Sequence, residues 1–159
     1  MIRCCAVLVA LLAVPVAPAV PPAARQAEGL SRAGLSAARA EPNLEKRSRK
    51  ALDNADQAFA ATRQAYRGGD LKQAQAALEE VRESVVLAHE SLKQTGKNPS
   101  KSPKHFKHAE IKTRALLRRL DDFRQEMSFE DRDTVEEARG VIEKIRQELL
   151  LGIMGGRKK

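Results

Sequence analysis

The chain has few aromatic residues, with four phenylalanines, one tyrosine and no tryptophan among 159 residues. Proteins that bind single-stranded nucleic acid commonly stack bases on exposed aromatic rings. Here every aromatic residue except Phe129 falls on an apolar helix face and is expected in the core. This scarcity argues against nucleic acid as a partner.

Cysteine is confined to Cys4 and Cys5. Both lie at the start of a short apolar run that extends to Val16 and is followed by small residues at positions 17–19. This layout predicts a secretory signal peptide over residues 1–19, and therefore a periplasmic or secreted protein. Cleavage would remove both cysteines, so no disulfide and no cysteine metal site is expected in the mature chain. The alternative, an uncleaved anchor, is disfavoured because a spanning helix needs about 20 apolar residues.

Motifs that carry chemistry are also lacking. The sequence contains no Glu-x-x-His pair of the kind that binds metals in helical bundles, no His-Glu-x-x-His, no Gly-x-Ser-x-Gly and no phosphate-binding glycine loop. We therefore expect neither enzymatic activity nor a cofactor.

Four stretches instead carry apolar residues at alternating spacings of three and four, which lines one face of an α-helix. The spacing predicts an all-α fold, an antiparallel four-helix bundle made of two helical hairpins and preceded by the signal peptide and a flexible linker. The linker is expected over residues 20–42, the four-helix domain over 43–154 and a basic tail over 155–159. The predicted helices cover residues 44–67, 71–95 and 103–127, followed by a fourth helix that runs to residue 151.

Local signals define most of these boundaries. Asn43 and Asp70 are suited to cap helix N-termini, and Gly68-Gly69 is suited to end the first helix. Pro103 fits the first position of the third helix, because its missing N–H has no partner there in any case. Gly152 is expected to end the fourth helix.

The break between the third and fourth helices depends on a single observation. The apolar stripe that ends at Met127 resumes at Val135, one residue out of register. We interpret Ser128-Phe129 as a short turn, with Ser128 as a cap. The alternative is one kinked helix of about 48 residues, roughly 72 Å long at 1.5 Å per residue.

The chain is basic, with a formal net charge of +8, which favours anionic partners. No acidic residue occurs between positions 91 and 109. The lysines of this segment are candidates for binding an anionic polymer or lipid head groups, or they are solvated residues that aid solubility. The candidate anion-binding residues are Lys97, Lys101, Lys104 and Lys107.

Two histidines in this region are three residues apart. His105 and His108 would share one face of a helix and could hold a zinc or copper ion, with Glu110 near them. The alternative is that both are solvated residues on a basic helix start.

The C-terminus is apolar at consecutive positions, so one helix face cannot bury all of it. It is a candidate for docking on a protein partner, for self-association or for contact with a membrane surface, or it caps the open end of the bundle. The candidate residues are Leu150, Leu151, Ile153, Met154, Arg157, Lys158 and Lys159. From these features we expect a non-enzymatic interaction or scaffold protein of the bacterial cell envelope. A binder of anionic polymer or lipid head groups, and a metal-binding helical protein, are the alternatives.

Overall fold

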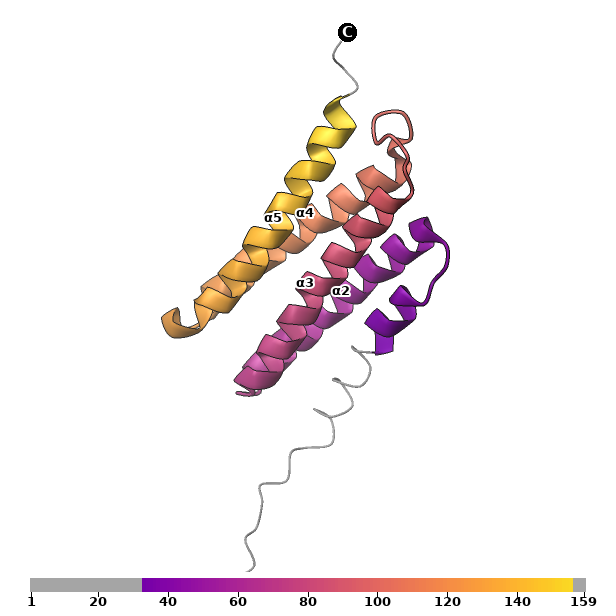
Figure 1. Ribbon diagram of the computed structural model, residues 1–159. Coiled ribbons are helices and arrows are strands. Elements are labelled where there is room, and N and C mark those ends of the chain that lie inside the picture. The colour runs from indigo at the N-terminus through magenta and orange to yellow at the C-terminus, as the bar shows by residue number, and fades with distance from the viewer. Residues whose placement is uncertain (1–32, 156–159) are drawn as a thin grey trace, which may run out of the picture.

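The computed structural model describes residues 33–155, and this part of the chain is all-helical (Figure 1). A short helix over residues 33–39 precedes four long helices. The long helices are α2 (Leu44–Arg67), α3 (Leu71–Gln94), α4 (Pro103–Glu126) and α5 (Arg132–Met154), with a 3-10 turn η1 (Phe129–Asp131) before α5. The prediction of an all-helical fold is confirmed. The predicted signal peptide lies outside the described residues, as do residues 20–32 of the predicted linker.

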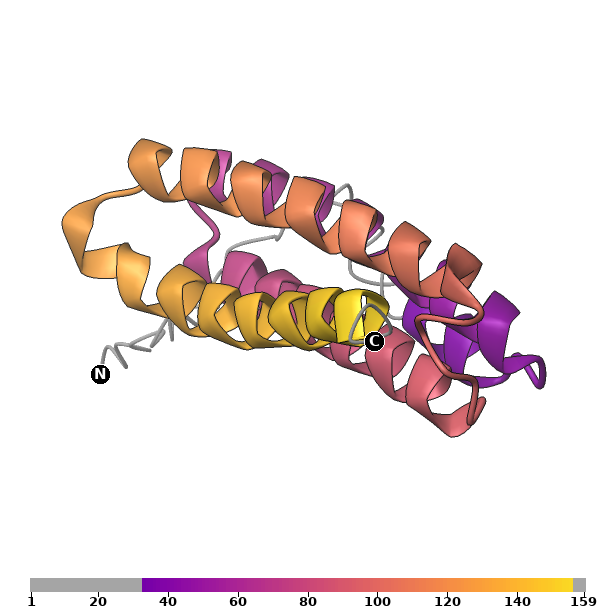
Figure 2. The same ribbon diagram turned by 90° about the horizontal axis from the view of Figure 1, so that it is seen from above.

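The helices pack around one apolar core. α2 makes its main contact with α3, and α4 with α5, while α3 also contacts α5 and α2 contacts α4 (Figures 1 and 2). The apolar stripes supply the core, and the largest fully buried apolar side chains are Val81, Val85, Leu92, Leu116, Leu120, Phe123, Val135 and Ile142. Within residues 33–155, no helix has both the length and the apolar character needed to cross a membrane.

The expected caps are present at the N-termini of α2 and α3. The side chains of Asn43 and Asp70 accept hydrogen bonds from the backbone N–H groups of Lys46 and Gln73, each at 3.0 Å. Gly69 adopts a φ of 78°, a left-handed conformation that residues with a side chain rarely adopt. These local interactions hold the tight turn between α2 and α3.

The structure separates α4 from α5, so the alternative of one kinked helix is wrong. Met127 and Ser128 both have extended backbones, with ψ near 150°. Ser128 precedes η1 but makes no capping hydrogen bond to the backbone; its hydroxyl donates to Asp131 Oδ2 at 2.6 Å instead. The expectation of a Ser128 cap is therefore corrected to a side-chain contact within the turn.

The expected end of the fourth helix is also corrected. α5 continues through Gly152 to Met154, and Gly155 is its C-cap. A glycine inside a helix costs about 1 kcal/mol relative to alanine but does not by itself stop the helix. Gly152 lies close to the loop before α4, as described below.

Residues 33–39 form a packed helix where the sequence predicted a flexible linker. Leu35 and Ala38 are buried, and Arg39 forms an ion pair with Glu83 of α3. A Cβ atom added to Gly34 would lie 2.0 Å from Asn54 Oδ1, so this close approach to α2 requires glycine. The packed helical region thus begins before residue 43.

Candidate functional site

The connection between α3 and α4 is an ordered loop that presents lysines to solvent. Asn98 organises it: its carbonyl accepts from the backbone N–H of Ser102 at 2.9 Å, and its side chain accepts from the backbone N–H of Ser100 at 2.9 Å. Gly96, with a φ of 65°, provides the left-handed position at which the chain leaves α3. The four lysines predicted to bind anions are all exposed, in the loop or at the start of α4: Lys97, Lys101, Lys104 and Lys107.

The fold brings an acid to this lysine segment that the local sequence lacks. Glu45, in the first turn of α2, accepts from Lys97 Nζ at 2.7 Å and lies 3.2 Å from His105 Nε2. The hydrogen bond from Lys97 lowers the pKa of Glu45; burial opposes this, and the positive charges of His105 and Lys104 add to it. Glu45 therefore stays ionised and offsets one of the lysines.

Three lysines remain without an acidic partner. Lys101, Lys104 and Lys107 form no salt bridge with any acid of residues 33–155. Together with Lys97 and His105, Lys104 and Lys107 line an open hollow of about 450 Å³. This surface is positively charged and accessible, and it can attract phosphate or carboxylate groups.

The two histidines of the predicted metal site are not joined by a third ligand. His105 faces Glu45, while burial, together with the charges of Arg49 and Lys112, lowers the pKa of the partly buried His108. Glu110, expected beside them, faces α5 instead, where Arg146 Nε lies 3.4 Å from its carboxylate. Nowhere in residues 33–155 do three or more His, Cys, Asp or Glu side chains gather in a way that could hold a metal ion.

The C-terminal apolar run divides between the core and solvent. Leu149 is buried and Ile153 packs against the core, so part of the run covers the end of the bundle. Leu150, Leu151 and Met154 are exposed to 36%, 70% and 54%. Nothing among residues 33–155 fully covers these three side chains. The predicted basic residues Arg157, Lys158 and Lys159 lie outside the described residues.

The lysine loop and the end of α5 meet in space. A Cβ atom added to Gly152 would lie 3.1 Å from Pro99 Cγ, so the loop packs directly on the last turns of α5. Both segments lie at the same end of the molecule (Figure 1). We call this the loop end, formed by residues 95–107 and 150–154. The sequence indicated each of the two segments but not that they meet. The only sequence signal for their contact was a glycine, Gly152, inside an apolar run.

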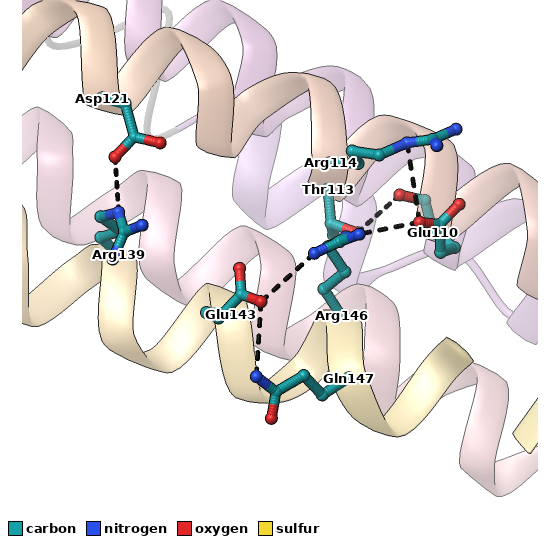
Figure 3. Close-up of polar contacts among 8 residues, drawn as sticks. All are labelled: Glu110, Thr113, Arg114, Asp121, Arg139, Glu143, Arg146 and Gln147. Carbon is teal, nitrogen blue, oxygen red and sulfur yellow. Dashed lines mark hydrogen bonds and ion pairs between the residues drawn. The ribbon is translucent and has the colours of Figure 1, made fainter. Parts of the chain in front are cut away.

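The other conspicuous polar cluster lies along the contact between α4 and α5 (Figure 3). Glu110 is contacted by Arg114 and Arg146, Arg146 also reaches Glu143 at 3.2 Å, and Arg139 Nε donates to Asp121 Oδ1 at 2.6 Å. Each charged group shown there has an oppositely charged partner. The arrangement joins two helices and leaves no charge directed at an open cavity.

The opposite end of the molecule offers little room for a ligand. A cavity of about 20 Å³ lies among α2, α3 and α4, lined in part by Tyr66, Leu78, Phe123 and Met127. That volume holds about one water molecule. The loop end is therefore the better candidate for an interaction site.

No protein-family model, curated protein or solved structure matches this chain. The fold and the loop end together define an all-helical protein with one basic and apolar end.

Proposed function

We propose that this chain is an exported, non-enzymatic interaction protein of the bacterial cell envelope, built as an antiparallel four-helix bundle that follows a signal peptide. It binds its partner, an envelope protein or a second copy of the chain, through the loop end. The observation that carries the proposal is the contact of Pro99 with Gly152, which brings the lysine-bearing loop against the last turn of α5, where other side chains are exposed apolar groups.

The remaining surface supports this choice by contrast. Between α2 and α4, Lys112 and Arg119 bind Asp56, and Arg63 binds Glu126. Ion pairs also join α4 to α5, as Arg124 with Glu136 and Arg139 with Asp121. Several charges along the helices thus serve the packing of the domain, whereas Lys101, Lys104 and Lys107 of the loop end form no salt bridge within residues 33–155.

Site-directed photo-crosslinking in intact cells tests the proposal. A photo-reactive residue at Leu151 should give adducts that mass spectrometry can identify. A photo-reactive residue placed instead at Phe129, which is 84% exposed at the far end of the domain, should give no adducts. Absence of adducts at Leu151, or equal yields at the two positions, would contradict binding of a protein partner through the loop end.

Export is tested separately. Cell fractionation should place the protein in the envelope or the medium, and mass spectrometry of its N-terminus should show that the first 19 or so residues are removed. An intact chain in the cytoplasm would contradict the proposal.

A second candidate is binding of anionic envelope material by the lysines alone. The lack of acidic partners for Lys101, Lys104 and Lys107 favours it. Charge reversal of these residues should then abolish an association that weakens with salt, because exposed charges are screened beyond about 8 Å at physiological ionic strength. Association that survives the reversal would rule this candidate out.

A further inference from the structure

We propose that the loop end binds the surface of an anionic phospholipid bilayer, with Leu151 and Met154 entering the interface while the lysines contact lipid phosphates. The inference rests on the proposed function in taking the loop end as the interaction surface, and it differs in assigning a lipid surface as the partner in place of a protein. In this proposal the lysine loop and the C-terminal turn of α5 contribute the basic half and the apolar half of one binding site.

The apolar half is a compact group at the end of a helix. Leu151 and Met154 are three residues apart and Leu150 and Met154 four, so their side chains project from neighbouring positions on the last turn of α5. All three are exposed, whereas Leu149 and Ile153 of the same turn are held against the core. The contacts of Leu149 and Ile153 with the core fix the direction in which the exposed side chains of this turn project.

The basic half is the lysine-bearing segment at the same end of the molecule (Figure 1). The exposed Lys101, Lys104 and Lys107 have no salt bridge among the described residues. Lysine ammonium groups sit on flexible four-carbon stems and do not require a fixed partner geometry. Juxtaposed lysines of this kind are attracted to the negative surface potential of anionic lipids.

A bilayer satisfies both halves at once. A soluble polyanion would neutralise the lysines but leave Leu151 and Met154 in water. An apolar groove on a protein would cover the two apolar side chains but would have to supply several acids to match the lysines. A lipid surface presents phosphates and, immediately beneath them, an apolar layer, so it can accept both the lysines and the exposed apolar side chains of the loop end.

Vesicle flotation tests the inference with the processed protein recovered from the cell envelope. The protein should float with vesicles of equal parts phosphatidylglycerol and phosphatidylcholine, and far less with phosphatidylcholine alone. The triple variant Lys101→Gln/Lys104→Gln/Lys107→Gln should lower the partition coefficient about 100-fold, since each lysine near an anionic surface contributes a factor of about five. Loss of an equal number of positive charges elsewhere, in Lys72→Gln/Arg118→Gln/Lys144→Gln, should have a small effect.

Insertion is tested by fluorescence, because the chain has no tryptophan of its own. Leu151→Trp should shift its emission to the blue when anionic vesicles are added. Phe129→Trp, at the opposite end of the domain, should not shift. Leu151→Ser/Met154→Ser should weaken vesicle binding by at least about tenfold, because the side chains it truncates are the ones that leave water.

The outcomes separate the inference from the proposed function. Vesicle binding that is unchanged in Leu151→Ser/Met154→Ser would overturn the bilayer as partner. Equal affinity of the protein for dextran sulfate and for vesicles would do the same. Absence of vesicle binding together with protein adducts at Leu151 in cells would also overturn it, while the proposed interaction role would stand. If neither vesicles nor cellular adducts are found, both proposals fail.

Discussion

The two ends of the helical domain are held together in different ways. The end opposite the loop end, which we call the turn end, comprises residues 66–72 and 126–134. There Tyr66 links the two connections: its hydroxyl accepts from the Ser128 backbone N–H at 2.9 Å and donates to Asp131 Oδ2 at 3.3 Å. Its ring also packs edge-on against Phe123, with the ring centroids 5.4 Å apart.

The segments of the loop end are held together by different contacts. Asn98 makes hydrogen bonds within the loop itself, and the link to the helices depends on Pro99 against Gly152 and on Glu45 with Lys97 and His105. Phe106 and Ile153 pack in or against the core, while Lys101, Lys104, Lys107, Leu151 and Met154 face solvent. From this difference we expect the turn end to contribute to stability and, under the proposed function, the loop end to contribute to binding.

The largest effect is expected from the aromatic cluster near the turn end. Phe123 is buried and packs edge-on against both Phe59 and Tyr66. Phe123→Ala should lower the free energy of unfolding by about 3–5 kcal/mol, through lost burial and a residual cavity. Urea denaturation followed by circular dichroism measures this.

Phe106, near the loop end, provides the matched control. It is also buried, but within residues 33–155 it has no ring contact. Phe106→Ala should therefore cost less than Phe123→Ala by about 1 kcal/mol, the typical contribution of an aromatic pair. An equal or larger loss for Phe106→Ala would show that the turn end is not the more strongly stabilised one.

Most of the helical pattern could be predicted from the sequence because its signals are local. Asn43, Asp70 and Gly69 act through backbone groups within a few residues, and the one-residue slip before Val135 is visible in the apolar spacing alone. The short helix over residues 33–39 was missed for the opposite reason. Its sequence has few large apolar residues, and its position depends on Gly34 against Asn54, a contact between segments far apart in the chain.

The same distinction between local signals and contacts of distant segments applies to the candidate site. The exposed lysines and the excess of apolar residues at the C-terminus are properties of composition, so the sequence could indicate them. Glu45 beside Lys97, and Pro99 on Gly152, depend on which helix ends the fold brings together. No spacing in the sequence records such contacts.

Removal of the Tyr66 hydroxyl should have the next largest effect. Tyr66→Phe keeps the ring on Phe123 but leaves the Ser128 N–H without its acceptor. The free energy of unfolding should fall by about 1 kcal/mol, the typical net contribution of one hydrogen bond. Hydrogen exchange should quicken at residues 127–131 and stay unchanged at residues 96–102. Faster exchange in both segments would mean that the two ends are coupled.

A pair of glycines in α5 gives a smaller and opposite effect. Gly140 is exposed, and an added Cβ atom would meet nothing within 4 Å, so Gly140→Ala should stabilise the protein by up to about 1 kcal/mol. Gly152→Ala has the same helix propensity gain but places its methyl group 3.1 Å from Pro99 Cγ. The gain should therefore be smaller at Gly152, and the loop should shift. Thermal unfolding compares the two variants, and equal stabilisation would show that the loop does not rest on α5.

The smallest effect is a pH dependence that begins in the half of the domain nearer the loop end. All three histidines lie there; His89, on α3, is 3.4 Å from Glu148 on α5. Burial lowers the pKa of His89, and Lys93 adds to this, while Glu148 and Glu90 oppose it. The unfolded chain therefore takes up a proton at higher pH than the folded chain, with a usual histidine pKa near 6.5. Stability present above pH 6.5 is lost as the pH falls through the lower pKa of folded His89.

Urea midpoints at pH 7.5 and 5.5 should differ less in His89→Gln than in the unmodified protein. His108 should account for part of the remaining difference, because burial lowers its pKa as well. An unchanged difference in the variant would place the acid sensitivity outside this contact between α3 and α5.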